Sequence, residues 1–254
     1  MQKIMKQLLL ITILIMYSLF TVTCTKDSGS NANSAGGSQT GQTGSLSRFV
    51  IVNNYLYTIS NDALSAYNIS NASLPVYKSI VRVGFSIQTL FAYQDKLFIG
   101  SNTEMYIYSL ANPEAPTKLS SVIYFVRGRD PVVAQDSVAY STVRNEFGGG
   151  GVLNCFNIKN ISQPFTVTSR QMINPYGLGI KGAALYVCEA DSGIKVFNIT
   201  NTYNPVLSKT VQFNETAYDV IITGNIMVCY IKGGIAFFDI SNAWLPVFIS
   251  SVKN

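Results

Sequence analysis

Short runs of apolar and aromatic residues alternate with brief polar turns from about residue 48 to the C-terminus. In the last stretch, Gly224-Asn225 joins two runs as a tight hairpin, and Asn242 and Pro246 bracket a later turn. Asn accepts left-handed backbone geometry, while Pro fixes φ and cannot donate to a strand ladder. The pattern predicts four short strands here, at residues 217–223, 226–230, 235–240 and 247–252.

One motif recurs five times: an aromatic residue, a small polar residue, Ile or Leu, a variable residue, Asn, three variable residues and Pro. The copies begin at Tyr67, Tyr108, Phe156, Phe197 and Phe238 and end at Pro75, Pro116, Pro164, Pro205 and Pro246. They are spaced 41, 48, 41 and 41 residues apart, with the extra residues of the third repeat at 144–151. Four strands in each such repeat are typical of a propeller blade. We therefore expect an all-β fold, a β-propeller of five blades with four antiparallel strands each.

The motif copy Phe238-Asp239-Ile240-Ser241-Asn242 resembles the LVIVD repeat of bacterial surface and secreted proteins. Units of that family have a strand ending in Gly, an apolar-aromatic strand, a strand ending in Asp-Ile-Ser-Asn-Pro and a closing strand. Here only the second unit keeps Pro directly after the Asn, at Pro113. The resemblance covers residues 47–254 and implies a β-propeller. It implies no activity, because members of the family mostly lack a defined one and a fold does not specify a function.

The order of the units bears on how the ring closes. Each unit runs from its first strand to its fourth, and no strand is left over to complete a shared blade. We expect a monomeric ring closed by packing of the first blade against the fifth. The alternative is an open arc that pairs with a second copy. The closed ring is favoured, because an open arc would leave apolar blade faces bare.

The N-terminal part predicts export and a lipid anchor. Lys3 and Lys6 precede an apolar run of 15 residues at 8–22, which is typical of a secretory signal and short for a membrane span. The run leads into Cys24 and resembles a bacterial lipobox, although Thr23 stands where a smaller residue is usual. An uncleaved anchor is the alternative. We assign residues 1–23 to the signal peptide, 24–46 to a flexible polar tether and 47–254 to the propeller.

This layout predicts a bacterial envelope lipoprotein, anchored through Cys24 at the periplasmic or surface face of the outer membrane.

The composition excludes several classes of function. The sequence has no histidine, which excludes a Ser-His-Asp triad and His-ligated zinc. The formal charge of +5 falls to +3 without the signal peptide, which is too small for a nucleic-acid partner. We expect no enzyme activity, cofactor or metal. Three cysteines remain after Cys24, namely Cys155, Cys188 and Cys229, and this odd number argues against a disulfide framework. We interpret Cys188 and Cys229 as small buried apolar residues.

Arginines gather in the loops that we assign to one face of the propeller. These candidate ligand-binding residues are Arg48, Arg82, Arg127, Arg129, Arg144 and Arg170. Gln88, Tyr176 and Tyr218 precede inner strands and would supply polar contacts and aromatic walls. Because a guanidinium holds carboxylates, phosphates and sulfates with two bonds, we hypothesise a site for an acidic glycan or an acidic protein segment. The alternative is that these arginines are solvated, or paired with acidic residues of the same face: Asp130, Glu146, Glu189, Asp191 and Asp219.

These observations leave three hypotheses for the function. The favoured one is a non-catalytic binding module, and the second is a scaffold subunit of an envelope complex. The third is a carbohydrate-active hydrolase or lyase, because Asp130 and Asp219 occupy equivalent positions and would face each other across the central funnel. Two carboxylates about 5–10 Å apart would suit glycoside hydrolysis.

Overall fold

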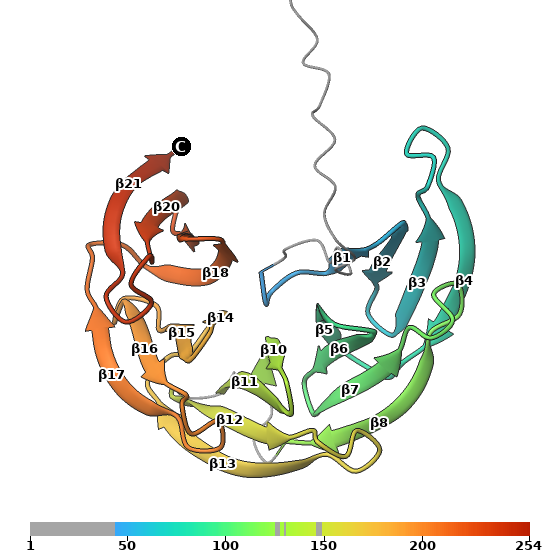
Figure 1. The fold of residues 1–254 in the computed structure, drawn as a ribbon, viewed down its shortest axis with the longest axis horizontal. Helices are drawn as coiled ribbons and strands as arrows, with labels where there is room; N and C mark the ends of the chain where they lie inside the picture. Colours follow the sequence, from blue (N-terminus) through green and yellow to red (C-terminus); the bar gives the residue numbers. More distant parts are fainter. Residues whose placement is uncertain (1–43, 125–127, 130, 146–148) are drawn as a thin grey trace, which may run out of the picture. The chain divides into compact units, whose positions relative to one another are not determined.

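The computed structural model describes residues 44–124, 128–129, 131–145 and 149–254, with the side chain of Arg129 left out (Figure 1). All regular secondary structure within these ranges is β. No helix in this part of the chain is long and apolar enough to cross a membrane.

The strands form antiparallel sheets in chain order, which we call blades 1 to 5. Blade 1 consists of β1 (Phe49–Val52), β2 (Tyr55–Ile59), β3 (Ala63–Asn68) and β4 (Val76–Arg82). Blade 2 consists of β5 (Ile87–Tyr93), β6 (Lys96–Ser101), β7 (Glu104–Ser109) and β8 (Thr117–Ile123). Blade 3 consists of β10 (Val132–Gln135), β11 (Val138–Asn145), β12 (Gly151–Asn157) and β13 (Phe165–Met172).

Blade 4 consists of β14 (Leu178–Lys181), β15 (Ala184–Cys188), β16 (Ile194–Asn198) and β17 (Val206–Val211). Blade 5 consists of β18 (Ala217–Thr223), β19 (Ile226–Ile231), β20 (Gly234–Asp239) and β21 (Val247–Lys253). The prediction of five four-stranded blades is confirmed. The two-residue strand β9 (Gly128–Arg129), which pairs with β11, was not predicted.

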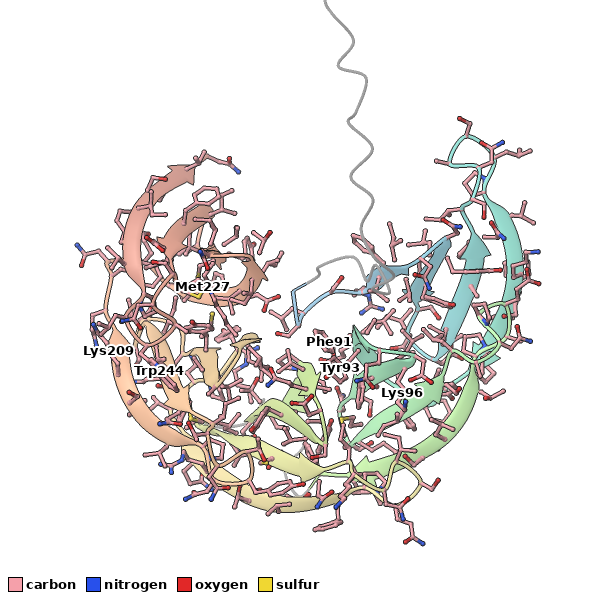
Figure 2. The ribbon with its side chains drawn as sticks, in the orientation of Figure 1. Phe91, Tyr93, Lys96, Lys209, Met227 and Trp244 are labelled. Carbon is pink, nitrogen blue, oxygen red and sulfur yellow. The ribbon has the colours of Figure 1, made fainter. Side chains whose placement is uncertain are left out.

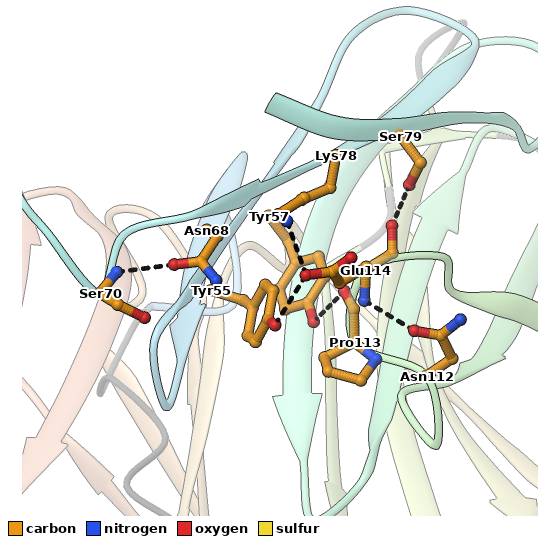
Figure 3. Close-up of polar contacts among 9 residues, drawn as sticks. All are labelled: Tyr55, Tyr57, Asn68, Ser70, Lys78, Ser79, Asn112, Pro113 and Glu114. Atoms are coloured by element: carbon orange, nitrogen blue, oxygen red, sulfur yellow. Dashed lines mark hydrogen bonds and ion pairs between the residues drawn. The ribbon is translucent and has the colours of Figure 1, made fainter. Parts of the chain in front are cut away.

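The repeated motif builds the same turn in every blade. The Asn of the motif accepts a hydrogen bond on its side chain from the backbone N–H two residues later, as between Asn112 and Glu114 at 3.1 Å (Figure 3). A register shift falls at the aromatic residue of each copy, for example between Ala66 and Tyr67. Such a bulge bends the strand and increases its twist. The motif therefore fixes both the turn and the bend that precede each outer strand.

Neighbouring blades pack through buried apolar clusters. In the described residues four clusters join blades 1–2, 2–3, 3–4 and 4–5. Figure 2 shows side chains between the sheets, with Met227 and Trp244 among those of blades 4 and 5. Every residue of β15 is buried, because this strand contacts a blade on each side. We call the side of a blade that faces the next blade in chain order its forward face, and the other its backward face.

Hydroxyl groups tie each forward face to the next blade. Tyr57 donates to the carbonyl of Pro113 at 2.8 Å, and Ser79 donates to that of Glu114 at 2.5 Å (Figure 3). The same tyrosine bond recurs from Tyr186 to the carbonyl of Ala243 at 2.8 Å. The acceptors lie in the Asn–Pro turn of the following blade, so the motif turn is also the docking point between blades.

Blades 1 and 5 lie at the two ends of an arc (Figure 1). Among the described residues no apolar cluster joins them. Phe49 on the backward face of blade 1 is 55% exposed, and Tyr230 on the forward face of blade 5 is also 55% exposed. The expectation that these two blades pack against each other was therefore wrong. They are linked instead by the chain segment that precedes β1.

We predict that Tyr186→Phe lowers the free energy of unfolding of the full chain by about 1 kcal/mol, because the half-buried carbonyl of Ala243 loses its donor. Tyr77→Phe, at a tyrosine that is 54% exposed on β4, should change it by less than about 0.5 kcal/mol. Denaturant unfolding of both variants measures the difference. Equal effects of the two substitutions would contradict the proposed role of the hydroxyl between blades.

Candidate functional site

A short segment before β1, residues 44–47, crosses to blades 4 and 5, and we call it the strap. The Ser45 hydroxyl donates to Asp219 Oδ1 at 2.9 Å and accepts from the N–H of Leu178 at 2.7 Å. The N–H of Leu46 donates to Asp219 Oδ2 at 3.0 Å. The carbonyl of Ser47 accepts from the N–H of Leu90 in blade 2 at 2.8 Å. The strap thus connects three blades near the centre of the arc.

Two glycines make room for the Asp219 carboxylate. A Cβ on Gly177 would overlap Asp219 Oδ1, and a Cβ on Gly44 would overlap Oδ2. Asp219 itself is 8% exposed. Burial raises its pKa to about 6, because loss of water around the carboxylate outweighs the hydrogen bonds from Leu46, Ser45 and Val220.

Two cavities lie beside the strap, and Leu46 lines both. The first, which we call the tyrosine cavity, has a volume of about 410 Å³. Its walls are Leu46, Pro131, Arg144, Pro175, Tyr176, Tyr218 and Tyr230, from blades 3, 4 and 5 and the segments before them. The second, the amide cavity, has a volume of about 490 Å³. Its walls are Leu46, Arg48, Asn61, Ser86, Ile87, Gln88, Thr89 and Asn102, from blades 1 and 2.

The tyrosine cavity holds a stacked guanidinium. Arg144 in β11 lies with its guanidinium carbon 4.1 Å from the centroid of the Tyr176 ring and donates to the Tyr176 hydroxyl. The Thr142 hydroxyl donates to the carbonyl of Tyr176 and fixes the backbone there. Stacking leaves the in-plane N–H groups of a guanidinium able to bind an oxyanion.

Two further tyrosines continue this wall. The Tyr218 ring centroid lies 5.2 Å from that of Tyr176, edge to face, and 5.5 Å from that of Tyr230. Within the described residues no carboxylate forms an ion pair with Arg144. The cavity therefore presents an aromatic wall of three rings inclined to one another, with one cation at its edge.

The amide cavity is more polar. The Gln88 side chain donates to the Asn102 side chain, and an Arg48 N–H lies 3.5 Å from the carbonyl oxygen of Ile59. This cavity offers amides and one exposed arginine but no aromatic side chain.

Of the nine proposed ligand-binding residues, the seven whose side chains are described fall into three groups. Arg144, Tyr176 and Tyr218 meet in the tyrosine cavity, and Arg48 and Gln88 line the amide cavity. Arg82 and Arg170 line neither: Arg82 is paired with Asp62, and Arg170 donates to the carbonyl of Pro205 at 3.0 Å. Arg127 lies outside the described residues. Of Arg129 only the backbone is described, and it pairs with Arg144.

The acidic residues of this face have structural partners where they are described. Glu189 is 2% exposed, accepts from the N–H of Ile173 at 2.6 Å and lies 3.4 Å from the Lys195 ammonium. Asp191 accepts from the Thr216 hydroxyl. Asp219 faces the strap and lines neither cavity. The two other acidic candidates, Asp130 and Glu146, lie outside the described residues.

Sequence reasoning missed Tyr230, and one observation would have found it. Three earlier repeats carry Ile59, Thr142 and Cys188 at the same register position, all buried against the next blade. A large tyrosine there breaks the repeat pattern. Leu46 was assigned to the tether and gave no such indication. The buried state expected for Cys188 and Cys229 is confirmed, and Cys155 is buried as well.

Comparisons with known proteins agree on the fold. No protein-family model matches the chain, and no curated protein matches its sequence. A functionally unknown protein from Desulfotomaculum acetoxidans matches 85% of this chain over 70% of its own, with a TM-score of 0.66 and 13% identity. The computationally designed Ika8 protein matches 80% of this chain over 60% of its own, with a TM-score of 0.56 and 12% identity.

BamB from Moraxella catarrhalis matches 77% of this chain over 55% of its own, with a TM-score of 0.55 and 9% identity. Identities this low show a shared fold and nothing more. The chain therefore has the β-propeller fold, and it spans about 60% of the length of the designed protein.

We predict that ionisation of Asp219 destabilises the fold. Its pKa is about 6 in the folded state and about 3.9 in an unfolded chain, so the folded state keeps the proton longer as pH rises. The resulting stability is fully present below pH 4 and is lost as pH rises through 6. It amounts to about 3 kcal/mol.

Unfolding of the parent and of Asp219→Asn between pH 4 and 7 measures this effect, because the variant cannot ionise there. The parent should lose about 2 kcal/mol relative to the variant across that range. If the difference in free energy of unfolding between the parent and Asp219→Asn stays constant with pH, the Asp219 carboxyl does not have a raised pKa.

Proposed function

We propose that this chain is a non-catalytic binding module of a bacterial envelope, and that the tyrosine cavity binds an acidic glycan. The observation that carries the proposal is the Arg144 guanidinium stacked on Tyr176 at the edge of an aromatic wall. A carboxylate or sulfate accepts two N–H bonds from such a guanidinium.

The aromatic wall supports a glycan over an acidic protein segment. Tyr176, Tyr218 and Tyr230 offer ring faces and hydroxyls, which suit the apolar faces and polar edges of sugar rings. A cavity of about 410 Å³ has room for one or two sugar residues, within the usual range for small-ligand sites. An acidic peptide would gain mainly from the charge and would leave these surfaces unused.

We propose that Arg144→Ala weakens binding of an oligogalacturonate, a chain of acidic sugars, by about 10- to 100-fold. Titration calorimetry on the full chain measures it at two salt concentrations, with the neutral galactose oligomer as a second ligand. Salt should weaken binding of the acidic oligomer to the parent. Arg144→Lys keeps the charge and loses the planar stack, so it should bind with intermediate affinity.

Arg170→Ala is the matched control, because Arg170 lies outside both cavities. It should bind the acidic oligomer like the parent. Equal affinity of the parent and Arg144→Ala would refute the proposed site. Binding of an acidic peptide without any binding of the oligomer would replace the glycan with a protein ligand.

A scaffold function is the second candidate, and the exposed apolar faces of blades 1 and 5 favour it. The carbohydrate-active alternative is the weakest of the three. Its proposed carboxylate Asp219 is covered by the strap, and its second carboxylate lies outside the described residues.

We also propose that the chain is a lipoprotein of the LVIVD repeat type. The lipobox-like residues at Cys24 and the polar tether support the anchor, and the five motif copies support the family. The signal peptide, Cys24 and most of the tether precede the described residues.

We predict that an alkyne-labelled fatty acid fed to a Gram-negative host is incorporated into the full chain, and that Cys24→Ala abolishes the label. Cys155→Ala should keep the label, because Cys155 is buried in blade 3. In-gel fluorescence after coupling to a dye reports both. Label that persists in Cys24→Ala would place the lipid on another residue, and absence of label from the parent chain would contradict the lipid anchor.

A further inference from the structure

The two end blades expose faces that every inner blade buries. Ile235 on the forward face of blade 5 is 37% exposed. The residues at its register position in the other blades are at most 2% exposed, and they are Leu64, Met105, Leu153 and Ile194. Phe49 on the backward face of blade 1 is 55% exposed. Its equivalents are also at most 2% exposed, and they are Leu90, Val132, Leu178 and Val220.

Both end faces are mainly apolar, with charged residues only near their edges: Asp219 and Asp239 on blade 5 and Arg82 on blade 1. In the three inner strands, alternation places seven uncharged residues on the forward face of blade 5: Ile221, Thr223, Ile226, Val228, Tyr230, Ile235 and Phe237. On the backward face of blade 1 it places Phe49, Ile51, Leu56, Thr58, Ser65 and Tyr67. Contiguous apolar patches of this kind mark interaction sites.

The docking points between blades are also present at both ends. Ser250 in β21 occupies the register position from which Ser79 donates to the carbonyl of Glu114. The equivalent carbonyl in blade 1 belongs to Ser73, in an exposed turn. Pro75 of that turn is exposed, whereas its counterpart Pro116 is buried where blade 1 covers blade 2.

We infer that blade 5 of one copy docks onto blade 1 of a second copy, head to tail, and repeats the interface that joins consecutive blades within the chain. The match is specific because a forward face is complementary to a backward face, and each copy carries one of each. Such a contact is heterologous, so every copy can engage two neighbours or a single partner twice. The expectation of a monomer depended on a closed ring, and the open arc removes that premise.

Cysteine cross-linking between two tagged full-length chains tests the inference. One chain carries Ser250→Cys and the other Ser73→Cys, and both are produced in the same cells and treated with a short thiol cross-linker. The expected product contains both tags. Ser251→Cys in place of Ser250→Cys is the matched control, because neighbouring residues of a strand point to opposite faces. It should give no product with both tags.

A second pair of substitutions separates docking from folding. Adding Ile235→Lys to the Ser250→Cys chain buries an unpaired charge in the proposed contact and should lower the yield of the product roughly tenfold or more. Adding Ile123→Lys instead, at a residue that is 72% exposed on blade 2, should leave the yield unchanged. Circular dichroism confirms that both chains keep their β structure.

Two results would overturn the inference. One is the absence of any product with both tags while both chains are folded. The other comes from a single chain that carries both cysteines: an internally linked monomer would show that blades 1 and 5 of the same copy meet.

Discussion

The interface between consecutive blades is the interaction on which the rest of this structure depends. A four-stranded sheet with apolar residues on both faces cannot bury them alone, so each blade is stable only against its neighbours. Every interface in the described chain combines an apolar cluster near the middle of the sheets with hydroxyl-to-carbonyl bonds near the outer edge. The tyrosine bond of Tyr57 and Tyr186 recurs at three of the four interfaces, and between blades 2 and 3, where Phe98 stands at that position, Ser120 donates to the carbonyl of Ile161. Because the acceptors lie in the Asn–Pro turns, the motif serves the interface as much as the local fold.

The candidate site arises where individual repeats depart from this common interface. Tyr230 and Asp219 occupy positions at which other repeats carry Ile59 and Arg48. The first substitution supplies a cavity wall, and the second supplies the anchor for the strap. The strap in turn brings Leu46 to the centre, where it contributes to both cavities. The repeats therefore supply the scaffold, and deviations from them supply the chemistry.

This division explains what could be predicted from the sequence. Strand positions and blade number follow from periodicity, so residues 217–223 were placed correctly as the first strand of blade 5. The aromatic neighbours Tyr176 and Tyr218 could be expected together, because Tyr176 lies just before β14 and Tyr218 lies at the start of β18, the inner strands of adjacent blades. The distribution of arginines over one face could not separate Arg144 from Arg170, since the separation depends on which way each side chain turns. The strap could not be predicted from the sequence, because its contacts with Asp219 join residues more than 170 positions apart.

Ring closure was mispredicted from a sound premise, namely that bare apolar faces are costly. A large apolar side chain that stays exposed forgoes about 1.5–3 kcal/mol, and a typical domain is stable by only about 5–15 kcal/mol. Leaving Phe49 and Ile235 exposed therefore costs a sizeable part of the stability of the domain. This cost favours burial of both side chains, but it does not specify which surface covers them. Tyr230 lies on the forward face of blade 5 and also lines the tyrosine cavity. Whatever covers that face changes the wall of the cavity, so docking at blade 5 and binding in the cavity must influence each other's affinity by the same factor.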